Sequence, residues 1–457
     1  MKKELLKTSN WVSGVQWLFF MFANIVIIPL TVGAAFDLSQ DKIATMLQLS
    51  FTITGVACIA QAFLGHKRAI MEGQSGLWWG IILTLVVTTS AQGMPIEVLG
   101  GSLAIGIFIS AVLTVIIGLA GLGPYLAKLF NPGVMGVFMF LFGCQLIQIF
   151  LKGMFGLPFG NSSGSESIDL PIALLGIIIA IIVIILNIKA PARIRSYALL
   201  MGIIVGWIAY ALIFGPESAG QKVSLKVELF PLGTPVWNTG VVITAVLAGL
   251  LNTANTFGAL KGTDSMYGTE TTKKQYRSSF TITGFFTGLS GLFGLVPYAP
   301  FVSSTGFLKQ TGILKKLPFI LGGSMFFLMG VIPPVGRFFS TIPLSIGSAV
   351  LFVAYLQLLN SSWDFFREVK FNTLNVYRSA IPLFVGIIIM TLPASAFESI
   401  PSSIRPVVSS GLLVGIILSL ILENVFPWDQ IGEERSQKET CPQGQKPKCP
   451  NVKFEDK

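Results

Sequence analysis

The chain has 457 residues, of which 53% are hydrophobic and only 11% are charged, and its mean hydropathy is +0.75. A soluble globular domain of this length needs more charged residues on its surface, so the composition excludes the soluble classes and predicts an integral membrane protein. The formal net charge of +10 does not point to nucleic acid, because the positive charges lie between apolar runs in the pattern of the positive-inside rule.

Apolar runs long enough to cross about 30 Å of hydrocarbon recur along the whole chain. The first begins after MKKELLKTSN and continues past the length of a signal peptide, so we expect a span rather than a cleaved leader. Thirteen spans are expected, at residues 11–33, 44–64, 76–90, 103–125, 130–151, 170–188, 196–214, 240–260, 280–296, 317–334, 341–360, 380–396 and 405–425.

The stretch VPYAPFVSSTGFLKQTG, residues 296–312, falls outside these spans because it is short and carries two prolines and two glycines. Counting it as a further crossing keeps the later cluster of Arg367, Lys370 and Arg378 on the cytoplasmic side, as the positive-inside rule requires. We therefore expect fourteen transmembrane segments, with both termini in the cytoplasm of a cell whose plasma membrane holds the protein.

Fourteen segments divide at the polar loop 215–238 into two sets of seven, and an odd number per set places the two halves in opposite orientations. We expect an all-α polytopic membrane protein built as a 7+7 inverted repeat, with repeats at residues 1–214 and 239–426 and an extracytoplasmic linker at 215–238. Residues 427–457 are charged and almost free of apolar side chains, so we expect a disordered cytoplasmic tail.

The third crossing of each half is anomalous. In KRAIMEGQSGLWWG, residues 67–80, small and polar residues precede an apolar run too short to span alone, and 296–312 takes the matching place in the second half. A matched pair of interrupted segments predicts a binding site at mid-membrane, because unwound backbone is tolerated there only beside protein or a water-filled cavity. The alternative is two re-entrant loops that pack without a ligand.

Side chains for catalysis or metal binding are scarce. His66 lies beside Lys67 and Arg68, and we interpret the three as an interfacial basic cluster at a helix end. The four cysteines have neither zinc spacing nor a disulfide pattern, and no buried catalytic set is evident, so we expect neither a metal site nor an enzyme. Glu72 is the one titratable candidate beside an anomalous crossing.

Polar residues also lie within the eighth crossing. Helical spacing over residues 240–264 places Asn252, Asn255, Thr256 and Ala259 on one face. A side-chain amide offers both a donor and an acceptor, which suits a flat heterocycle whose edge alternates N–H and C=O groups. The alternative is that the amides join neighbouring helices by hydrogen bonds, with small residues beside them for close contact.

Three segments carry motifs of a known family. The matching residues are Gly14, Gln16, Val26, Pro29 and Gly33 in the first span, Asn255 and Gly258 in the eighth, and Pro297, Tyr298, Phe301, Gly306, Thr311 and Gly312 in the anomalous stretch. These motifs resemble the nucleobase-ascorbate transporter family, also called nucleobase:cation symporter family 2, which includes uracil and xanthine permeases. The sequence departs from the family at Trp17, which replaces the usual histidine, at Asn255, which replaces a glutamate, and at Ser303 and Ser304, which replace an acidic or amide pair.

The resemblance implies a core domain and a gate domain, with short strands in segments 3 and 10 paired antiparallel at mid-membrane and substrate between them and the eighth helix. It implies a homodimeric permease that carries a purine such as xanthine, hypoxanthine or guanine, or else uracil, into the cell by alternating access, coupled to H⁺ or Na⁺ and without other cofactors. Because Asn255 cannot titrate, three alternatives stay open: another heterocycle, coupling through Glu72, or uncoupled facilitated transport. The nearest rival is an anion transporter of the related sulfate-permease type, which usually carries a sizeable cytoplasmic domain after the last helix.

The residues and the resemblance together give an expected site. Its substrate-binding residues are Asn255, Asn252, Ser303, Ser304, Thr305, Gly306, Ser75, Gly76 and Gln16. Glu72 is expected as the coupling candidate. Tyr298 or Phe301 is expected to stack on the base, although packing is the commoner role for either ring.

Overall fold

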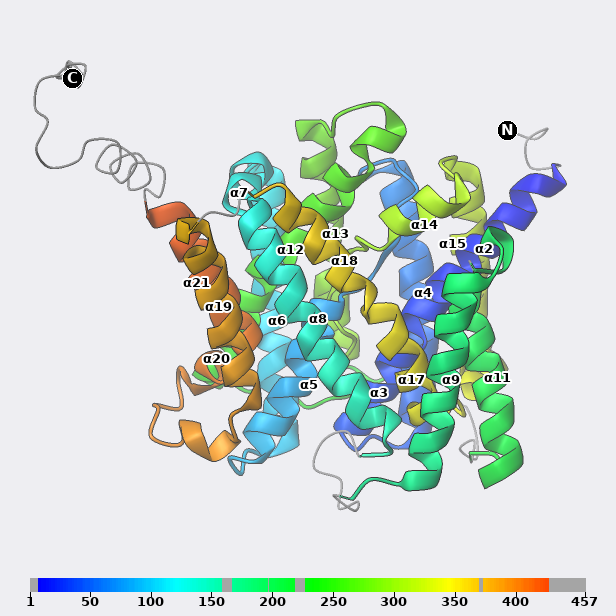
Figure 1. Ribbon diagram of the computed structural model, residues 1–457, viewed down its shortest axis with the longest axis horizontal. Coiled ribbons are helices and arrows are strands. Elements are labelled where there is room, and N and C mark those ends of the chain that lie inside the picture. The colour runs from blue at the N-terminus through cyan, green and yellow to red at the C-terminus, as the bar shows by residue number, and fades with distance from the viewer. Residues whose placement is uncertain (1–6, 158–166, 196, 218–226, 370–372, 427–457) are drawn as a thin grey trace, which may run out of the picture.

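The computed structural model describes residues 7–157, 167–195, 197–217, 227–369 and 373–426 (Figure 1). The expected tail, 427–457, and the middle of the expected linker, 218–226, lie outside the described residues. Within the described ranges the chain is helical apart from two short strands.

One group of helices draws on two distant stretches of sequence. The first stretch supplies α2 (Thr8–Ile25), α3 (Ile27–Ala35), α4 (Gln40–Phe63), β1 (Glu72–Gln74), α5 (Gly76–Ser90), α6 (Ile96–Ala120) and α7 (Gly123–Leu129). The second supplies α12 (Thr239–Tyr267), α13 (Lys273–Phe293), β2 (Tyr298–Pro300), α14 (Ser304–Thr311), α15 (Lys316–Val331) and α16 (Pro333–Phe339). Helices α12 and α13 both pack on α6, whereas α15 packs on α2 and α4.

The remaining long helices form a second group. They are α8 (Pro132–Met154), α9 (Leu170–Lys189), α11 (Ala198–Phe214), α17 (Leu344–Tyr355), α18 (Gln357–Arg367), α19 (Thr373–Thr391) and α21 (Gly411–Val425), with the short elements α10 (Ala192–Arg195), η1 (Ala394–Phe397) and α20 (Arg405–Val408) in the connections. Helix α8 contacts α17, α18, α19 and α21, while α17 contacts α9 and α11. Each group therefore contains helices from both halves of the sequence.

Glycines allow the helices of the first group to approach to backbone contact. A Cβ atom at Gly55 of α4 would lie 2.6 Å from the carbonyl oxygen of Gly323 on α15. One at Gly330 of α15 would lie 2.4 Å from the backbone nitrogen of Thr52. Small residues are the usual means of close helix contact in a membrane, where burial of apolar surface drives association only weakly.

Seven helical segments of the described chain are long and apolar enough to cross a membrane. They are the joined α2 and α3, α4, α6, α8, α9, α12 and the joined α17 and α18. The pair α15 and α16 makes an eighth if its 90° bend lies within one span. This count is smaller than the expected fourteen for three reasons. Helices α5, α11, α19 and α21 are shorter apolar helices, α13 is not among the apolar spans, and the stretch 296–312 consists of a strand and a short helix.

The anomalous stretch 296–312 connects opposite sides of the helix bundle. Helix α2 begins and α21 ends on one side, the upper side of Figure 1, which we call the termini face. Helix α6 ends at this face, and α13 runs antiparallel to it. Gly118, near the end of α6, lies against Arg277 and Thr281 in the first half of α13. Helix α15 starts at the termini face again, so the chain between α13 and α15 returns across the bundle.

The two strands pair antiparallel, with Glu72 opposite Pro300, Gly73 opposite Ala299 and Gln74 opposite Tyr298. The ladder continues beyond them, because Ser75 N–H donates to Pro297 O at 2.8 Å and Phe301 N–H donates to Met71 O at 2.8 Å. All six strand residues are buried. The expected strand pair is therefore confirmed, and it satisfies backbone groups that would be costly to leave unpaired in hydrocarbon.

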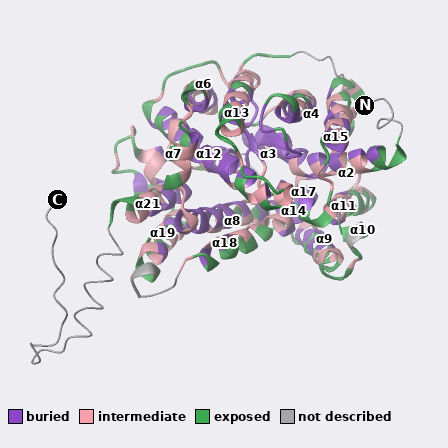
Figure 2. Ribbon diagram, turned by 90° about the horizontal axis from the view of Figure 1, so that it is seen from above, coloured by how far each residue is buried: buried purple, intermediate pink, exposed green. Residues whose placement is uncertain are grey.

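Burial follows the arrangement of the helices. Seen from above, buried residues gather on α3, α8 and α12, near the middle of the molecule (Figure 2). Helix α9 instead exposes an apolar ladder at three- and four-residue spacing: Leu170, Leu174, Ile177, Ile178, Ile181, Ile185 and Ile188. An apolar face of this kind suits contact with lipid.

Candidate functional site

Each strand leads directly into the first turn of a short helix. Ser75 is the N-cap residue of α5 and Ser303 is the N-cap residue of α14, and neither side chain makes a capping hydrogen bond. The first N–H groups of a helix have no partner within it, so α5 presents donors where β1 ends. In α14, by contrast, Ser304 N–H donates to Phe301 O at 3.1 Å and Thr305 N–H donates to Val302 O at 3.0 Å. The sequence places small residues at these positions, which leaves the backbone accessible.

Beside the strands, a neutral polar cluster joins α5, α12 and β2. Ser75 Oγ donates to Asn252 Oδ1 at 2.6 Å, and Asn255 Nδ2 donates to the same oxygen at 3.0 Å. Asn252 Nδ2 donates to Tyr298 O at 2.9 Å, and so ties α12 to the strand. We call Ser75, Asn252 and Asn255 the amide cluster; all three side chains belong to buried residues.

The two side-chain amides of the cluster differ in the hydrogen-bonding atoms that they leave unused. Asn252 uses both its oxygen and its nitrogen within the protein. Asn255 uses its nitrogen, and none of the hydrogen bonds among the described residues involves its Oδ1 atom. Among the described residues, Asn252 therefore links α12 to α5 and β2, whereas the Oδ1 acceptor of Asn255 has no hydrogen-bond partner.

The amide cluster lies where the two groups of helices meet. Gly76, the residue after Ser75, is half-buried against the ring of Phe142 on α8 and the hydroxyl of Tyr355 on α17. Gly258, one turn beyond Asn255, faces Met135 of α8. Sequence reasoning missed Phe142 and Tyr355, because nothing local in α8 or α17 marks the side chains that face α5.

The expected stacking residues point in different directions. Tyr298 is fully buried, and its hydroxyl lies 3.0 Å from Thr54 Oγ1 on α4, so the ring packs inside the first group. Phe301 is half-buried, and its ring lies against Gly73 of the opposite strand. Of the two rings, only Phe301 lies at a partly exposed position beside the strands.

The other expected residues lie further from the amide cluster. Ser304 Oγ accepts a hydrogen bond from Met71 N–H at 3.1 Å, and Thr305 lies against Gly262, two turns beyond Asn255 on α12. Ser303 and Gly306 are exposed in the first turn of α14. Gln16 is half-buried on α2, and none of the hydrogen bonds of the amide cluster includes it.

Glu72 lies on the other side of strand β1, away from the amide cluster. Its carboxyl accepts hydrogen bonds from Gln61 Nε2 of α4 at 3.0 Å and from Thr283 Oγ1 of α13 at 2.8 Å. The residue has no exposed surface. Gln61 was not among the expected residues, although an amide inside an apolar span is itself a signal of an interior contact.

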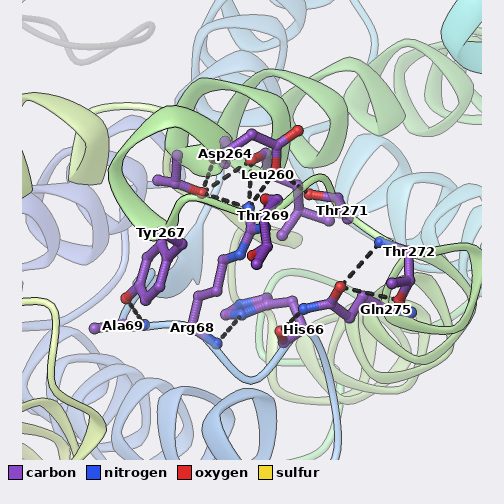
Figure 3. A network of polar contacts seen from close by, with 12 residues as sticks. His66, Arg68, Ala69, Leu260, Asp264, Tyr267, Thr269, Thr271, Thr272 and Gln275 are labelled. Atoms are coloured by element: carbon purple, nitrogen blue, oxygen red, sulfur yellow. Dashed lines mark hydrogen bonds and ion pairs between the residues drawn. The ribbon is translucent and has the colours of Figure 1, made fainter.

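A buried ion pair holds the segment that enters β1 (Figure 3). Arg68 Nη1 donates to Asp264 Oδ1 at 2.6 Å, to Leu260 O at 2.8 Å and to Thr263 Oγ1 at 3.0 Å, all on the last turns of α12. Arg68 Nη2 donates to Thr269 O at 2.8 Å. The guanidinium thus connects the start of the strand to the helix that carries the amide cluster.

Tyr267 completes this network. Its ring lies 5.1 Å from the Arg68 guanidinium carbon, which is within cation–π range. Its hydroxyl accepts from Ala69 N–H at 2.8 Å and donates to Leu314 O at 3.0 Å, just before α15. Tyr267 therefore connects the end of α12 to the residues that precede β1 and to those that precede α15.

The expected interfacial basic cluster is wrong for two of its three residues. Lys67 is exposed, but His66 has no exposed surface and Arg68 is 2% exposed. His66 Nδ1 accepts from Arg68 N–H at 3.1 Å, and His66 O accepts from Gln275 Nε2 at 2.8 Å (Figure 3). The acceptors on α12 supply the partners that make burial of Arg68 possible.

Known structures share this architecture. The transmembrane domain of the cyanobacterial bicarbonate transporter BicA matches with a TM-score of 0.58 and 17% identity, over 90% of this chain and 97% of that one. The murine SLC26A9 anion transporter in its inward-facing state matches with a TM-score of 0.60 and 12% identity, over 91% of this chain and 68% of that one. At these identities the likeness shows the fold alone.

The sequence decides the family. Residues 8–395 match the xanthine/uracil permease model, which is described as a permease family. The chain belongs to the xanthine/uracil permease family. The expected resemblance and the expected class, a transporter rather than an enzyme, are both confirmed by this match, and the protein is a multi-pass membrane protein.

Relatives in this family cover nearly the whole chain. "Putative purine permease YwdJ" of Bacillus subtilis (strain 168) is 27% identical over 91% of this chain and 95% of its own length. Uric acid permease PucJ of the same organism is 23% identical, over 93% and 94%. The xanthine permease of that organism is 22% identical, over 90% and 92%.

We expect burial of His66 to make the stability of the folded protein sensitive to acid. Burial, followed by the charges of Arg68 and Lys316, lowers the pKa of His66 to about 3. The unfolded chain therefore binds one more proton below its ordinary pKa of about 6.5, so stability falls as the pH drops from about 6.5 towards 3. We expect His66→Asn to flatten part of this slope when Tm in detergent is followed against pH. An unchanged slope would mean that His66 does not contribute.

Proposed function

We propose that the protein is a permease that carries a nucleobase into the cell by alternating access. The observation that carries this proposal is the neutral amide cluster at the meeting point of the strand pair, α12 and the second group of helices. Membership of the permease family gives the class of activity, and the cluster gives the chemistry of the ligand.

The donors and acceptors favour a flat, uncharged heterocycle. Asn255 Oδ1 is available to accept a ring N–H, and the first N–H groups of α5 are available to donate to carbonyl oxygens. Among the described residues, no lysine or arginine hydrogen-bonds to the amide cluster. Xanthine, hypoxanthine, guanine and uracil fit this pattern better than the small anions named for the structural neighbours BicA and SLC26A9.

We assign the expected residues to roles around this ligand. Asn255, Ser75 and the backbone at Gly76 bind the base edge. The backbone from Ser303 to Gly306 lines the end of the site opposite Asn255, and Phe301 stacks on the ring of the base from the side of the strands. Gln16 closes the site when the two groups of helices move relative to each other.

The helix contacts support an inverted repeat of fourteen segments. When each segment is matched with the one seven positions later, a contact between two helices has a counterpart between their matched helices. The contact of α4 with α15 then corresponds to that of α13 with α6. The contact of α2 with α15 corresponds to that of α12 with α6, and the contact of α9 with α11 corresponds to that of α19 with α21. On this basis we assign residues 1–214 and 239–426 to the two repeats, with a linker at 215–238 and a tail at 427–457.

The two groups of helices support an assignment of two domains with different roles in transport. We assign the first group, with both strands, as the core domain and the second as the gate domain. A rigid core that moves against the gate would expose the amide cluster to each side in turn. We further assign both termini to the cytoplasm of the plasma membrane, a homodimeric assembly, and coupling of transport to a cation.

Uptake by cells that lack their own nucleobase permeases tests the proposal. We expect saturable uptake of at least one labelled base among xanthine, hypoxanthine, guanine, adenine and uracil, and none of sulfate or bicarbonate. Asn255→Ala removes one ligand hydrogen bond worth about 1 kcal/mol, so KM should rise about fivefold to tenfold. Confirmed membrane expression with no uptake of any base would refute the nucleobase assignment. An unchanged KM in Asn255→Ala would refute the site.

A further inference from the structure

Glu72 is a buried carboxyl that has no cationic partner among the described residues. Among the described residues two other carboxylates are mostly buried, and both are ion-paired: Asp264 with Arg68 at 2.6 Å and Glu423 with Arg378 at 3.0 Å. In the part of the chain that the structure describes, the Glu72 side chain hydrogen-bonds only to neutral groups. A carboxyl held inside a membrane protein without a cation usually marks a functional site rather than a structural one.

The groups around Glu72 are neutral on every side. From α4 come Gln61 and Cys58, whose sulfur lies 3.3 Å from Glu72 O. From α13 come Thr283 and, through its carbonyl, Ser279. The titratable groups beside Glu72 in these elements are the Cys58 thiol and, on the paired strand β2, the Tyr298 phenol, which bonds to Thr54 of α4.

Tyr298 and Cys58 are uncharged in their ordinary protonation states at neutral pH. No described group in contact with the carboxyl therefore compensates a negative charge there.

Two neutral donors hold the Glu72 carboxyl in place. Gln61 Nε2 lies within hydrogen-bond distance of Glu72 Oε2 at 3.0 Å, Thr283 Oγ1 at 3.2 Å and Ser279 O at 3.3 Å. Thr283 Oγ1 lies 2.8 Å from Glu72 Oε1. Both groups donate to the carboxyl and both are neutral, so neither compensates a charge on the carboxylate.

Glu72 is connected to the amide cluster through strand β1, and to the termini face through hydrogen bonds. Ser75 of the amide cluster follows Glu72 by three residues across a paired strand. In the other direction, Gln61 Oε1 accepts from His66 N–H at 3.4 Å, and His66 O accepts from Gln275 in the exposed first turn of α13. Glu72 therefore sits between the proposed ligand and one face of the membrane.

We propose that Glu72 binds and releases the proton whose movement is coupled to transport. This inference rests on the proposed function. The carboxylate takes up a proton from one side, and the resulting acid gives the same proton to the other side, with no bond to the substrate. Loss of the proton places an uncompensated charge on β1, which shifts the strand that leads to Ser75.

Infrared difference spectroscopy on the purified protein tests proton binding without any substrate. We expect the carbonyl band of a buried protonated carboxyl, sensitive to pH and shifted in deuterium oxide, to be absent from Glu72→Gln. The matched control Glu97→Gln, an exposed carboxyl in the first turn of α6, should retain the band. A spectrum of Glu72→Gln identical to that of the wild type would refute the proton site.

Transport by reconstituted protein tests the coupling. An inward gradient of one pH unit should drive about tenfold accumulation of the base at one proton per molecule, since 1.4 kcal/mol corresponds to a factor of ten. Glu72→Gln should reach only the outside concentration, yet still exchange labelled for unlabelled base, which shows that it is folded. Glu97→Gln should accumulate normally. Proton-driven accumulation by Glu72→Gln, or accumulation driven by Na⁺ alone, would refute the inference.

The experiments distinguish failure of the nucleobase function from failure of the proton site. If the infrared band is lost in Glu72→Gln but the wild type transports no base, the proton site is supported and the nucleobase function is refuted. Transport of a base by both proteins with equal dependence on pH would leave the function standing and refute the role of Glu72.

Discussion

Asn252→Ala is expected to lower the initial rate of nucleobase uptake about 100-fold, the largest effect of any single change in the amide cluster. The alanine removes an acceptor for Ser75 and Asn255 and a donor to Tyr298 O. Each buried group left without a partner costs about 1–3 kcal/mol, and these three groups position both the strand and the first turn of α5. The measurement is uptake per molecule of protein in the membrane.

The control for this change is Asn360→Ala, which removes the same side chain from an exposed position on α18. Uptake should stay close to that of the wild type. The comparison with Asn255→Ala is also informative, since Asn255 is expected to affect mainly KM, whereas Asn252 affects stability and rate together. Equal rates for Asn252→Ala and Asn360→Ala would show that the amide cluster does not support transport.

Arg68→Ala is expected to destabilise the folded protein by about 3–5 kcal/mol, because removal of one member of a buried ion pair leaves its partner groups uncompensated. The guanidinium satisfies Asp264 and three further oxygens at the end of α12. Arg68→Lys should recover only part of the loss, since an ammonium cannot reproduce the planar fork. Reversible unfolding in detergent, followed by denaturant titration, measures the difference.

Arg367→Ala provides the comparison for this prediction. Arg367 also pairs with an aspartate, Asp364, but at 3.5 Å and with both side chains about 70% exposed. Exposed pairs contribute about 0–1 kcal/mol, so the stability should hardly change. If Arg68→Ala were as stable as Arg367→Ala, the network at the entry to β1 would not hold the core together.

The sequence predicted the general architecture because its signals are local. Apolar length identified membrane helices, and the matched interruptions at 67–80 and 296–312 identified the two segments that contain strands. Helical spacing placed Asn252 and Asn255 on one face, and they do contact each other. The resemblance to a family supplied the antiparallel pairing, which composition could not.

The errors arose where a contact joins residues far apart in the chain. Arg68 looks like an interfacial charge, since the Asp264 carboxylate that compensates it lies 196 residues away. Nothing near Glu72 indicates that Gln61 and Thr283 will enclose it from two different helices. Span counting failed for a different reason, because a crossing made of a strand and a short helix is not a long apolar helix.

The strand pair also constrains the order in which the protein is assembled. Met71, at the entry to β1, bonds to Ser304, which is synthesised 233 residues later. At about 5–20 residues per second, this interval is on the order of 10–50 seconds. During that time the first half contains a half-crossing whose backbone groups have no partner in lipid. The amino-terminal half is therefore not an independent folding unit, and completion of the core waits for the carboxy-terminal half to leave the ribosome.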